Sequence, residues 1–382
     1  MEKYQTDLLY LMACALNNRI PENKRVEIMD LEKIYTLSEK HSVAAMTDMA
    51  LESAGAFQGD EKSVLKSQWM ETKERAVRKN LLLKAERQVL FKYMDLNRIW
   101  HMPLKGAVIE SMYPRFGMRE MADQDILFDP SYQTQICEWM EKRGYYVQCV
   151  GMGNHDVYEK PPVYNFELHT SLIGEVHKAE WRAYYQDVKA RLIRDDANGY
   201  GYHFSDEDFY VYMMVHALKH FSDCGTGVRT LADIYVYVRQ KESTMDWNYI
   251  QQEVEKLDMV SFEYELRQLS IKLFSGEVGK LTASEEQQLE YMVGSGTYGT
   301  VKNYVENKIK KFKQGTVTDR QARVKYIWSR IWKPDEECKL YYPIAYRHKW
   351  LKPFLLVYRG IKGITVKRER LKNEIKIIRG SK

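Results

Sequence analysis

The stretch GMREMADQDILFDP, residues 117–130, places two aspartates, Asp123 and Asp125, at the start of an apolar run. Residues 126–128 favour a short β-strand, and the Asp-Pro pair at 129–130 ends it. Side chains two residues apart on a strand point to the same side, so the two carboxylates would lie together and repel each other. A metal ion, or nearby arginine and lysine side chains, would relieve that repulsion. A short DxD motif also occurs as a solvated strand entrance, so the surrounding sequence has to decide between these interpretations.

The segments on both sides of this stretch predict a small sheet with short helices. Residues 98–106, RIWHMPLKG, indicate a strand that leads into a glycine turn, and residues 107–114 indicate a short helix that ends at a proline. Residues 131–144 predict a helix with a serine near its start and a glycine at its end. Three further segments predict strands: YYVQCVG, HDVYEKPP and VYNFELHTSL. Together these elements define an expected sheet unit at 98–175.

The regions that flank this unit have the periodicity of helices. Residues 62–97 carry apolar side chains three and four positions apart with many charges between them, which predicts a long amphipathic helix. We therefore expect a helical lead-in at 1–97, a helical region at 176–312 and a basic C-terminal segment at 313–382. The predicted fold class is α+β, with a small mixed β-sheet embedded between N-terminal and C-terminal helical regions.

Composition places the chain among soluble globular proteins. It has 382 residues, of which 45% are hydrophobic and 29% charged, and its length suits two or three domains or one large domain with additions. No run of 18 apolar residues occurs, so we expect no transmembrane span, and the first 20 residues favour an amphipathic helix over a signal peptide. Five scattered cysteines without a CxxC motif favour a reducing, cytoplasmic location and argue against a disulfide framework and a cysteine-based zinc module.

Charge is distributed unevenly along the chain, although the net charge is only +5. Residues 301–382 contain 23 Lys and Arg against 7 Asp and Glu, a net charge of +16, whereas residues 1–300 have a net charge of −11. This asymmetry predicts an anionic partner for the C-terminal tail: nucleic acid, a membrane surface or the acidic body of the protein itself. A solvated basic helix explains the same composition, and the sequence leaves both explanations open.

Two-metal phosphoryl transfer needs several carboxylates that converge on one spot, where they hold hard cations such as Mg²⁺. Asp123 and Asp125 supply two of them, and the predicted strand VYNFELHTSL supplies Glu167 as a candidate third. His169 lies two residues further on and therefore on the same side of that strand. Taken alone, Glu167 is more readily an outward-facing strand residue.

The turn before the aspartates has features that suit a phosphate. Lys105 and Gly106 end one predicted strand just before a helix, where a glycine allows close backbone approach and the helix N-terminus favours an anion. Lys105 adds a point charge. Arg119 stands four residues before Asp123, where it would either balance the acids or hold a triphosphate.

These residues together resemble a known family. The segment LKGAVIESMYPRFGMREMADQDILF, followed by EKRGYY and FELHTSL, is similar to the uncharacterised nucleotidyltransferase family of the polymerase-beta-type superfamily, a group with many bacterial members. The block at 104–172 carries the specific motifs. The helix before the sheet, the segment HALKHF…GVRTLADI and the ending YYPIAYRHKWLKPFLLVYRGIKGI resemble the same family more loosely.

The resemblance implies a metal-dependent enzyme that moves an NMP group from an NTP, with ATP the expected donor, to an acceptor hydroxyl with release of pyrophosphate. It implies Mg²⁺ or Mn²⁺ as cofactor, with Asp123, Asp125 and Glu167 as catalytic and metal-binding residues. Lys105, Gly106 and Arg119 would then contact the nucleotide phosphates. The acceptor, the base preference and the oligomeric state are not implied.

The sequence departs from the superfamily pattern at the turn. The usual Gly-Ser pair is replaced by Lys105–Gly106, so no serine hydroxyl is available to a phosphate, and the distance to the DxD motif is longer than usual. The residue between the aspartates is Gln124 instead of an apolar one. The altered turn and the basic tail support an alternative function: a non-catalytic nucleotide- or nucleic-acid-binding protein that retains the fold.

Two further motifs point to other chemistry and are weaker. GSGTYGTV at 294–301 satisfies the kinase glycine-loop pattern, but only 81 residues follow it and they contain no VAIK-type lysine, HRD or DFG motif. We interpret it as a loop between helices that is free to border the active site. His216 and His220 are one helical turn apart but lack the glutamate of a HExxH site, so we expect packing, surface or pocket-lining residues.

Overall fold

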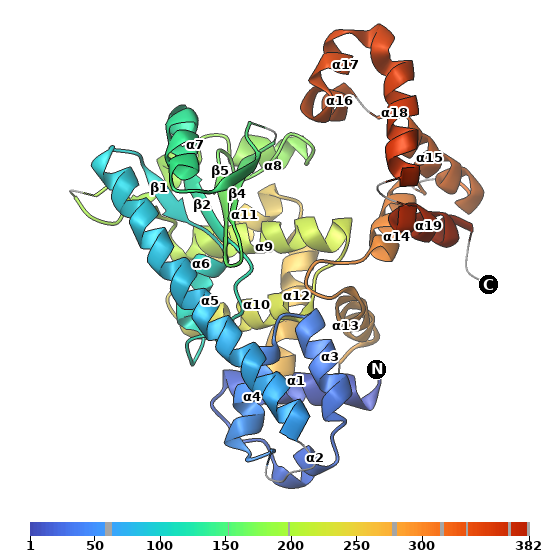
Figure 1. Ribbon diagram of the computed structural model, residues 1–382. Helices are drawn as coiled ribbons and strands as arrows, with labels where there is room; N and C mark the ends of the chain where they lie inside the picture. Colours follow the sequence, from blue (N-terminus) through green and yellow to red (C-terminus); the bar gives the residue numbers. More distant parts are fainter. Residues whose placement is uncertain are drawn as a thin grey trace.

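The computed structural model shows an α+β protein in which helices surround one mixed sheet (Figure 1). The predicted fold class is therefore confirmed. The structure describes residues 1–57, 63–151, 153–197, 199–276, 281–313, 317–333, 335–365 and 368–379.

The sheet has five strands in the order β1-β2-β5-β4-β3. The central pair, β2 and β5, is parallel, and all other neighbours are antiparallel. This arrangement puts two strands that are distant in sequence side by side at the middle of the sheet. The strands are β1 (His101–Pro103), β2 (Gln124–Phe128), β3 (Tyr146–Cys149), β4 (His155–Lys160) and β5 (Tyr164–His169).

The long helix α5 (Ser63–Leu96) and α7 (Gln133–Lys142) cover one face of the sheet. Alternation along β2 explains the contact: Ile126 and Phe128 join a core cluster with residues of α5 and α7, whereas Leu127 between them belongs to the other core cluster. Residue Asp125 therefore points away from α5, toward the face that Leu127 occupies. The cluster under α5 and α7 includes Leu83, Leu90, Met94, Ile136, Met140, Phe166 and Leu168.

The opposite face of the sheet meets a larger helical core, which combines the first helices of the chain with the helices that follow the sheet. Helix α1 packs on α4 and α12, and α10 packs on α12, so the first helices and the helices after the sheet share one core. The N-terminal helices are α1 (Lys3–Leu16), α2 (Asn23–Glu27), α3 (Leu31–Lys40) and α4 (Ala44–Ser53). The later ones are α9 (Asp206–Asp223), α10 (Val228–Lys241), α11 (Trp247–Lys256), α12 (Val260–Phe274) and α13 (Ala283–Ser295).

Short elements connect these layers. The helix α6 (Gly106–Ile109) and the 3₁₀ turn η2 (Glu110–Met112) follow β1, and η3 (Pro130–Tyr132) leads into α7. After the sheet come α8 (Ala179–Tyr184) and η4 (Val188–Arg191). The prediction of helices throughout 176–312 missed the hairpin of β6 (Ile193–Arg194) and β7 (Tyr202–His203). Two-residue strands around a glycine-rich turn are too short to show a period of two.

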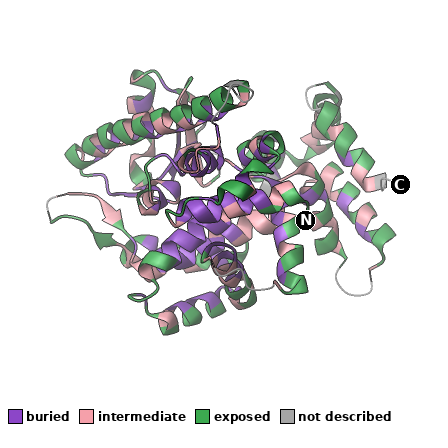
Figure 2. Ribbon diagram, turned by 90° about the horizontal axis from the view of Figure 1, so that it is seen from below, coloured by how far each residue is buried: buried purple, intermediate pink, exposed green. Residues whose placement is uncertain are grey.

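The chain ends in a group of helices that projects from the body (Figure 1). Figure 2 shows that residues near the C-terminus are mostly exposed, whereas the buried residues concentrate in the central helices. The last helix packs on α14, and its buried Glu374 forms an ion pair with Arg330 at 3.1 Å. These helices are α14 (Val301–Phe312), α15 (Asp319–Ile331), α16 (Asp335–Tyr341), α17 (Pro343–Arg347), η5 (Lys349–Leu351), α18 (Lys352–Thr365) and α19 (Arg368–Arg379).

Among the described residues, no helix is both long enough and apolar enough to cross a membrane.

Candidate active site

The parallel pairing of β2 and β5 brings two of the predicted acids together. Asp125 is the Cα partner of Glu167, and both side chains point to the face of the sheet that α9 covers. Asp123 lies just before β2, two residues from Asp125, and lines the same cavity. This cavity has a volume of about 470 Å³ and is bounded by the sheet on one side and by α9 and the start of α10 on the other. The structure thus gathers the three predicted carboxylates around one enclosed space.

Asp125 carries its charge in a buried setting because two groups stabilise it. Its Oδ1 accepts hydrogen bonds from Lys105 Nζ at 2.6 Å and from His169 Nε2 at 2.8 Å. Burial works against the ionised form, but the lysine and the histidine prevail and hold the pKa of Asp125 well below its ordinary value. Burial lowers the pKa of His169 to about 4, so this histidine is neutral at pH 7 and its Nε2 carries the proton that Asp125 accepts.

Glu167 is in the opposite electrostatic state. Burial and the nearby Asp125 charge raise the pKa of Glu167 to about 7. The pKa of Asp123 is also raised, first by burial and then by Asp125. Two of the three carboxyl groups therefore resist ionisation, while the third is ionised. Additional positive charge, beyond that of Lys105, would stabilise the ionised form of all three.

The donor set fits a divalent cation. Carboxylate oxygens of Asp123, Asp125 and Glu167 are hard ligands of the kind that Mg²⁺ and Mn²⁺ take. Two imidazoles stand beside them: one ligand atom each from His155, Glu167 and His169 come within 4.8 Å of one another. His155 is the cross-strand partner of His169 on β4, and its Nε2 lies 3.8 Å from Glu167 Oε2. The raised pKa values of two of the acids are what a cation at this spot would relieve.

The turn at Lys105 and Gly106 has an unusual backbone. Lys105 has a positive φ of 48°, a conformation that costs a side-chain-bearing residue on the order of 1–2 kcal/mol. With this backbone conformation, Lys105, two residues after β1, directs its Nζ toward Asp125. A side chain at Gly106 would not fit, because a Cβ there would lie 2.3 Å from Nη1 of Arg119. The glycine is therefore explained by the close approach of an arginine, and the pair also lines the cavity.

Arg119 is held by a buried acid. Its Nε and Nη2 donate to the two oxygens of Asp233 on α10 at 2.8 and 2.9 Å, and Tyr113 Oη donates to the same carboxylate at 2.7 Å. Both charged side chains are largely buried. Arg119 lines the cavity next to Gly106, but its fork is engaged by Asp233. This pair connects the turn before the DxD motif to the helical core.

We expect Arg119→Met to lower the free energy of unfolding by about 3–5 kcal/mol, because it leaves Asp233 buried without its cation. Urea denaturation monitored by circular dichroism measures this loss. Arg119→Met with Asp233→Asn should recover most of it, since the asparagine still accepts the hydrogen bond from Tyr113. A single variant that keeps its stability and loses only nucleotide affinity would instead make Arg119 a phosphate ligand.

Helix α9 forms the wall of the cavity opposite the sheet, and the sequence indicated only part of this wall. His216 and His220 line the cavity with their Nε2 atoms 3.0 Å apart, and burial lowers the pKa of His220 to about 3. The pair is therefore a neutral, pocket-lining pair, one of the roles that the sequence left open. Lys219 and Arg229 line the cavity as well, and sequence reasoning did not single them out. No local motif marks either base, since only the packing of α9 and α10 against the sheet brings them to the acids.

The glycine-rich stretch at 294–301 lies beside this cavity. It connects α13 to α14, and Gly296 and Gly299 take positive φ angles of 69° and 72°. Thr297 and Tyr298 from this loop line the cavity. The loop thus borders the candidate site, as the sequence interpretation allowed, and it does so without the lysine and aspartate motifs of a kinase.

The raised pKa of Glu167 makes a prediction for the metal-free protein. In the unfolded chain a glutamate titrates near 4.3, whereas in the folded state Glu167 titrates at about 7. The folded state therefore binds more protons between these values, so Glu167 stabilises the fold fully below about pH 4.3, and this stability is lost as the pH rises to about 7.

We expect wild-type protein in EDTA to lose thermal stability relative to Glu167→Gln between about pH 5 and pH 8, with a constant difference at higher pH. Melting curves of both proteins in matched buffers measure this difference. Parallel curves across the whole range would contradict the raised pKa.

Comparison with known proteins identifies the family of this chain. Residues 28–275 match the family described as uncharacterised nucleotidyltransferase. No curated protein and no solved structure matches the chain. The matched range covers well over half of the 382 residues and contains β1 to β5, α9, α10 and every acid of the site described above. The chain therefore belongs to this family of nucleotidyltransferases, and it is a transferase enzyme.

Proposed function

We propose that the protein is a metal-dependent nucleotidyltransferase that moves an NMP group from an NTP, with ATP the expected donor, to an acceptor hydroxyl. The acceptor oxygen bonds to the α-phosphorus, the bond to the β-phosphate oxygen breaks and pyrophosphate leaves. The observation that carries this proposal is the register of β2 and β5, which sets Asp125 beside Glu167 in a cavity that Asp123 also lines.

In this proposal Asp123, Asp125 and Glu167 hold Mg²⁺ or Mn²⁺. When bound, such an ion polarises the transferred phosphoryl group and neutralises the charge that develops on the leaving oxygen. Asp125 is suited to a cation because it is ionised, and its neighbour His169 is neutral and orients it. Glu167 stands opposite Asp125 in the same cavity, where its carboxylate is placed to accept the proton of the acceptor hydroxyl.

Lys105 and Gly106 act on the nucleotide phosphates. Lys105 Nζ neutralises Asp125 in the structure, and once a divalent cation takes over that charge the ammonium is free to hold a phosphate. Gly106 lines the cavity beside Lys105, so the turn lies within reach of a phosphate bound there. The missing serine hydroxyl of the usual turn is thus replaced by a charged lysine on the preceding residue. We assign Arg119 a positioning role, since it fixes this turn against Asp233.

The proposal is tested by incubating the purified protein with each α-labelled NTP and either Mg²⁺ or Mn²⁺, with and without cell extract. We expect labelled NMP to appear on a component of the extract, with release of unlabelled pyrophosphate. NTP binding without transfer under all of these conditions would favour the alternative, a non-catalytic nucleotide- or nucleic-acid-binding protein.

For the C-terminal tail we propose an anionic membrane surface as partner. On α18 the side chains of Phe354, Val357, Tyr358 and Ile361 share one helical face and are 53–65% exposed. Along the sequence, basic residues are interspersed with these apolar residues and with the neighbouring Trp350. This pattern is typical of helices that lie in the plane of an anionic bilayer.

We expect the protein to sediment with vesicles that contain phosphatidylglycerol but not with neutral phosphatidylcholine vesicles, and Phe354→Asp with Ile361→Asp to abolish this binding. Asp123→Asn with Asp125→Asn should leave it unchanged. Binding to duplex DNA in place of vesicles, insensitive to the α18 substitutions, would contradict this assignment.

A further inference from the structure

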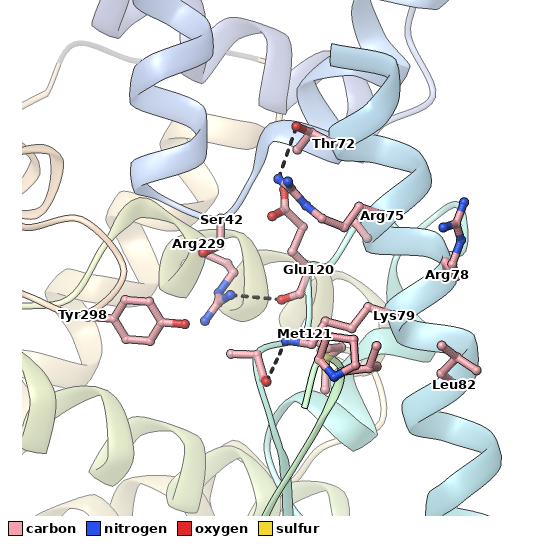
Figure 3. A pocket seen from close by; sticks show the side chains of 14 residues that line it. Ser42, Thr72, Arg75, Arg78, Lys79, Leu82, Glu120, Met121, Arg229 and Tyr298 are labelled. Atoms are coloured by element: carbon pink, nitrogen blue, oxygen red, sulfur yellow. Dashed lines mark hydrogen bonds between the residues drawn. The ribbon is translucent and has the colours of Figure 1, made fainter. Parts of the chain in front are cut away.

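A second cavity adjoins the candidate active site. It has a volume of about 480 Å³ and lies between α5 and the segment that leads into β2 (Figure 3). It shares Ala122, Arg229 and Tyr298 with the catalytic cavity, and Ala122 directly precedes Asp123. The two cavities therefore meet at the first aspartate of the DxD motif.

The lining of this cavity is strongly basic. Arg75, Arg78 and Lys79 come from neighbouring turns of α5, and Figure 3 shows Arg229 and Tyr298 on the opposite side. The single acid in the lining is Glu120, whose Oε1 accepts a hydrogen bond from the backbone of Ala45 at 2.9 Å. Arg75, Lys79 and Arg229 thus surround one carboxyl group that is already hydrogen-bonded, and Arg78 adds a fourth positive charge at the edge of the lining.

The bases have few acidic partners of their own in the described part of the chain. Lys79 Nζ donates to the carbonyl oxygen of Ala122 at 2.9 Å, and Arg229 Nη1 donates to the carbonyl oxygen of Glu120 at 3.0 Å. Arg75 reaches the exposed Glu39 only at 3.4 Å. Because carbonyl groups are neutral, these hydrogen bonds leave the positive charge of the partly buried cations uncompensated and available to an anionic ligand.

The reaction needs two substrates that meet at the reacting phosphorus. The residues proposed to hold the donor phosphates, Lys105 and Gly106, line the first cavity and not the second. The second cavity is therefore available to the other substrate, and its volume suits a small molecule better than a polymer. Arginine forks recognise phosphate groups with two parallel hydrogen bonds, which makes a phosphate the anion that this lining fits best.

We propose that the second cavity binds the phosphate group of a small phosphorylated acceptor and so directs its hydroxyl toward Asp123 and Glu167. This inference rests on the proposed function and specifies its missing substrate class. Arg75 and Arg78 form the outer, exposed part of the cavity, and Lys79 and Arg229 form its partly buried part next to Ala122.

The test separates this site from the donor site by using one probe for each. Calorimetry measures binding of inorganic phosphate and of glycerol 3-phosphate, and separately binding of α,β-methylene-ATP with Mn²⁺, a nucleotide that does not react at the transferred group. We expect Arg75→Gln with Arg78→Gln to weaken both phosphate probes about tenfold or more, in line with the loss of charged hydrogen bonds, and to leave the nucleotide affinity unchanged.

Lys66→Gln with Lys92→Gln is the matched control, because it removes two exposed positive charges from α5 outside both cavities. It should leave all three affinities unchanged. Saturating α,β-methylene-ATP should not displace phosphate from the wild-type protein.

Three results would overturn the inference: wild-type protein that does not bind either phosphate probe at millimolar concentration, equal weakening by the cavity pair and the control pair, and displacement of phosphate by α,β-methylene-ATP. The last would assign the cavity to the donor triphosphate. Failure of the proposed function would appear in other measurements, as absent Mn²⁺-dependent nucleotide binding or as nucleotide binding without transfer. Neither result changes what the phosphate titrations measure.

Discussion

Asp123→Asn combined with Asp125→Asn should abolish nucleotidyl transfer, with a loss on the order of 10³-fold or more, because the carboxylates proposed to hold the cation that neutralises the phosphates are gone. Divalent-ion-dependent NTP binding should be lost in parallel. Transfer of α-labelled NMP and calorimetric titration with Mn²⁺ and α,β-methylene-ATP measure the two effects. Asp129→Asn, at the far end of β2, is the control and should behave like wild type.

The stability of these variants separates the two aspartates. Asp123 lies near a like charge, so Asp123→Asn should be neutral or stabilising. Asp125 neutralises the partly buried Lys105, so Asp125→Asn should destabilise the fold, and adding Lys105→Met should restore it. A double aspartate variant that is folded and fully active would show that the paired carboxylates are not the catalytic site.

Glu167→Gln should lower turnover by roughly 10²–10⁴-fold, the range expected for loss of a positioned general base, with only a modest change in NTP affinity. Glutamine keeps the size of the side chain, and Asp123 and Asp125 remain to hold the nucleotide-bound ion. Steady-state kinetics of transfer together with nucleotide titrations give the two quantities.

Glu159→Gln on β4 is the matched control, because it removes an acid from the same sheet outside the cavity lining. A Glu167→Gln enzyme with near-normal turnover would remove Glu167 from the mechanism. Equal losses of turnover and of NTP affinity would instead make Glu167 a ligand of the nucleotide-bound ion and not a base.

Sequence patterns predicted the elements of the sheet well because its strands are short, apolar and separated by turn residues. The run at 126–128 and the helix that follows it appear at the expected places as β2 and α7. The period of two also put Glu167 and His169 on one side of their strand, and the structure shows both lining the cavity. Their roles in catalysis remain predictions.

Other features of the site depend on contacts between distant segments, which local periodicity does not contain. The partner of Arg119 is Asp233, 114 positions later, so an isolated arginine before the DxD motif gives no sign that its fork is occupied. Lys219 and His155 enter the cavity only through the packing of α9 and the pairing of β4 with β5. The sequence left open whether a metal ion or a basic side chain relieves the repulsion between the two aspartates, and the structure places Lys105 against Asp125.

The parallel pairing of β2 and β5 also bears on how this site tolerates change during evolution. The chain between the two strands runs through α7, β3 and β4. Strand β4 pairs with β5 beside Glu167, but the described residues of the turns at 143–145 and 150–153 are not among those that line the cavity, so insertions in these turns lengthen the protein without moving either acid. One residue inserted within β5 before Glu167 is different, because it turns every later side chain to the opposite face of the sheet. Glu167 would then face the core under α5, and Phe166 or its neighbour would face the cavity. Length variation among relatives should therefore collect in the turns around 143–154 and be absent from 164–169.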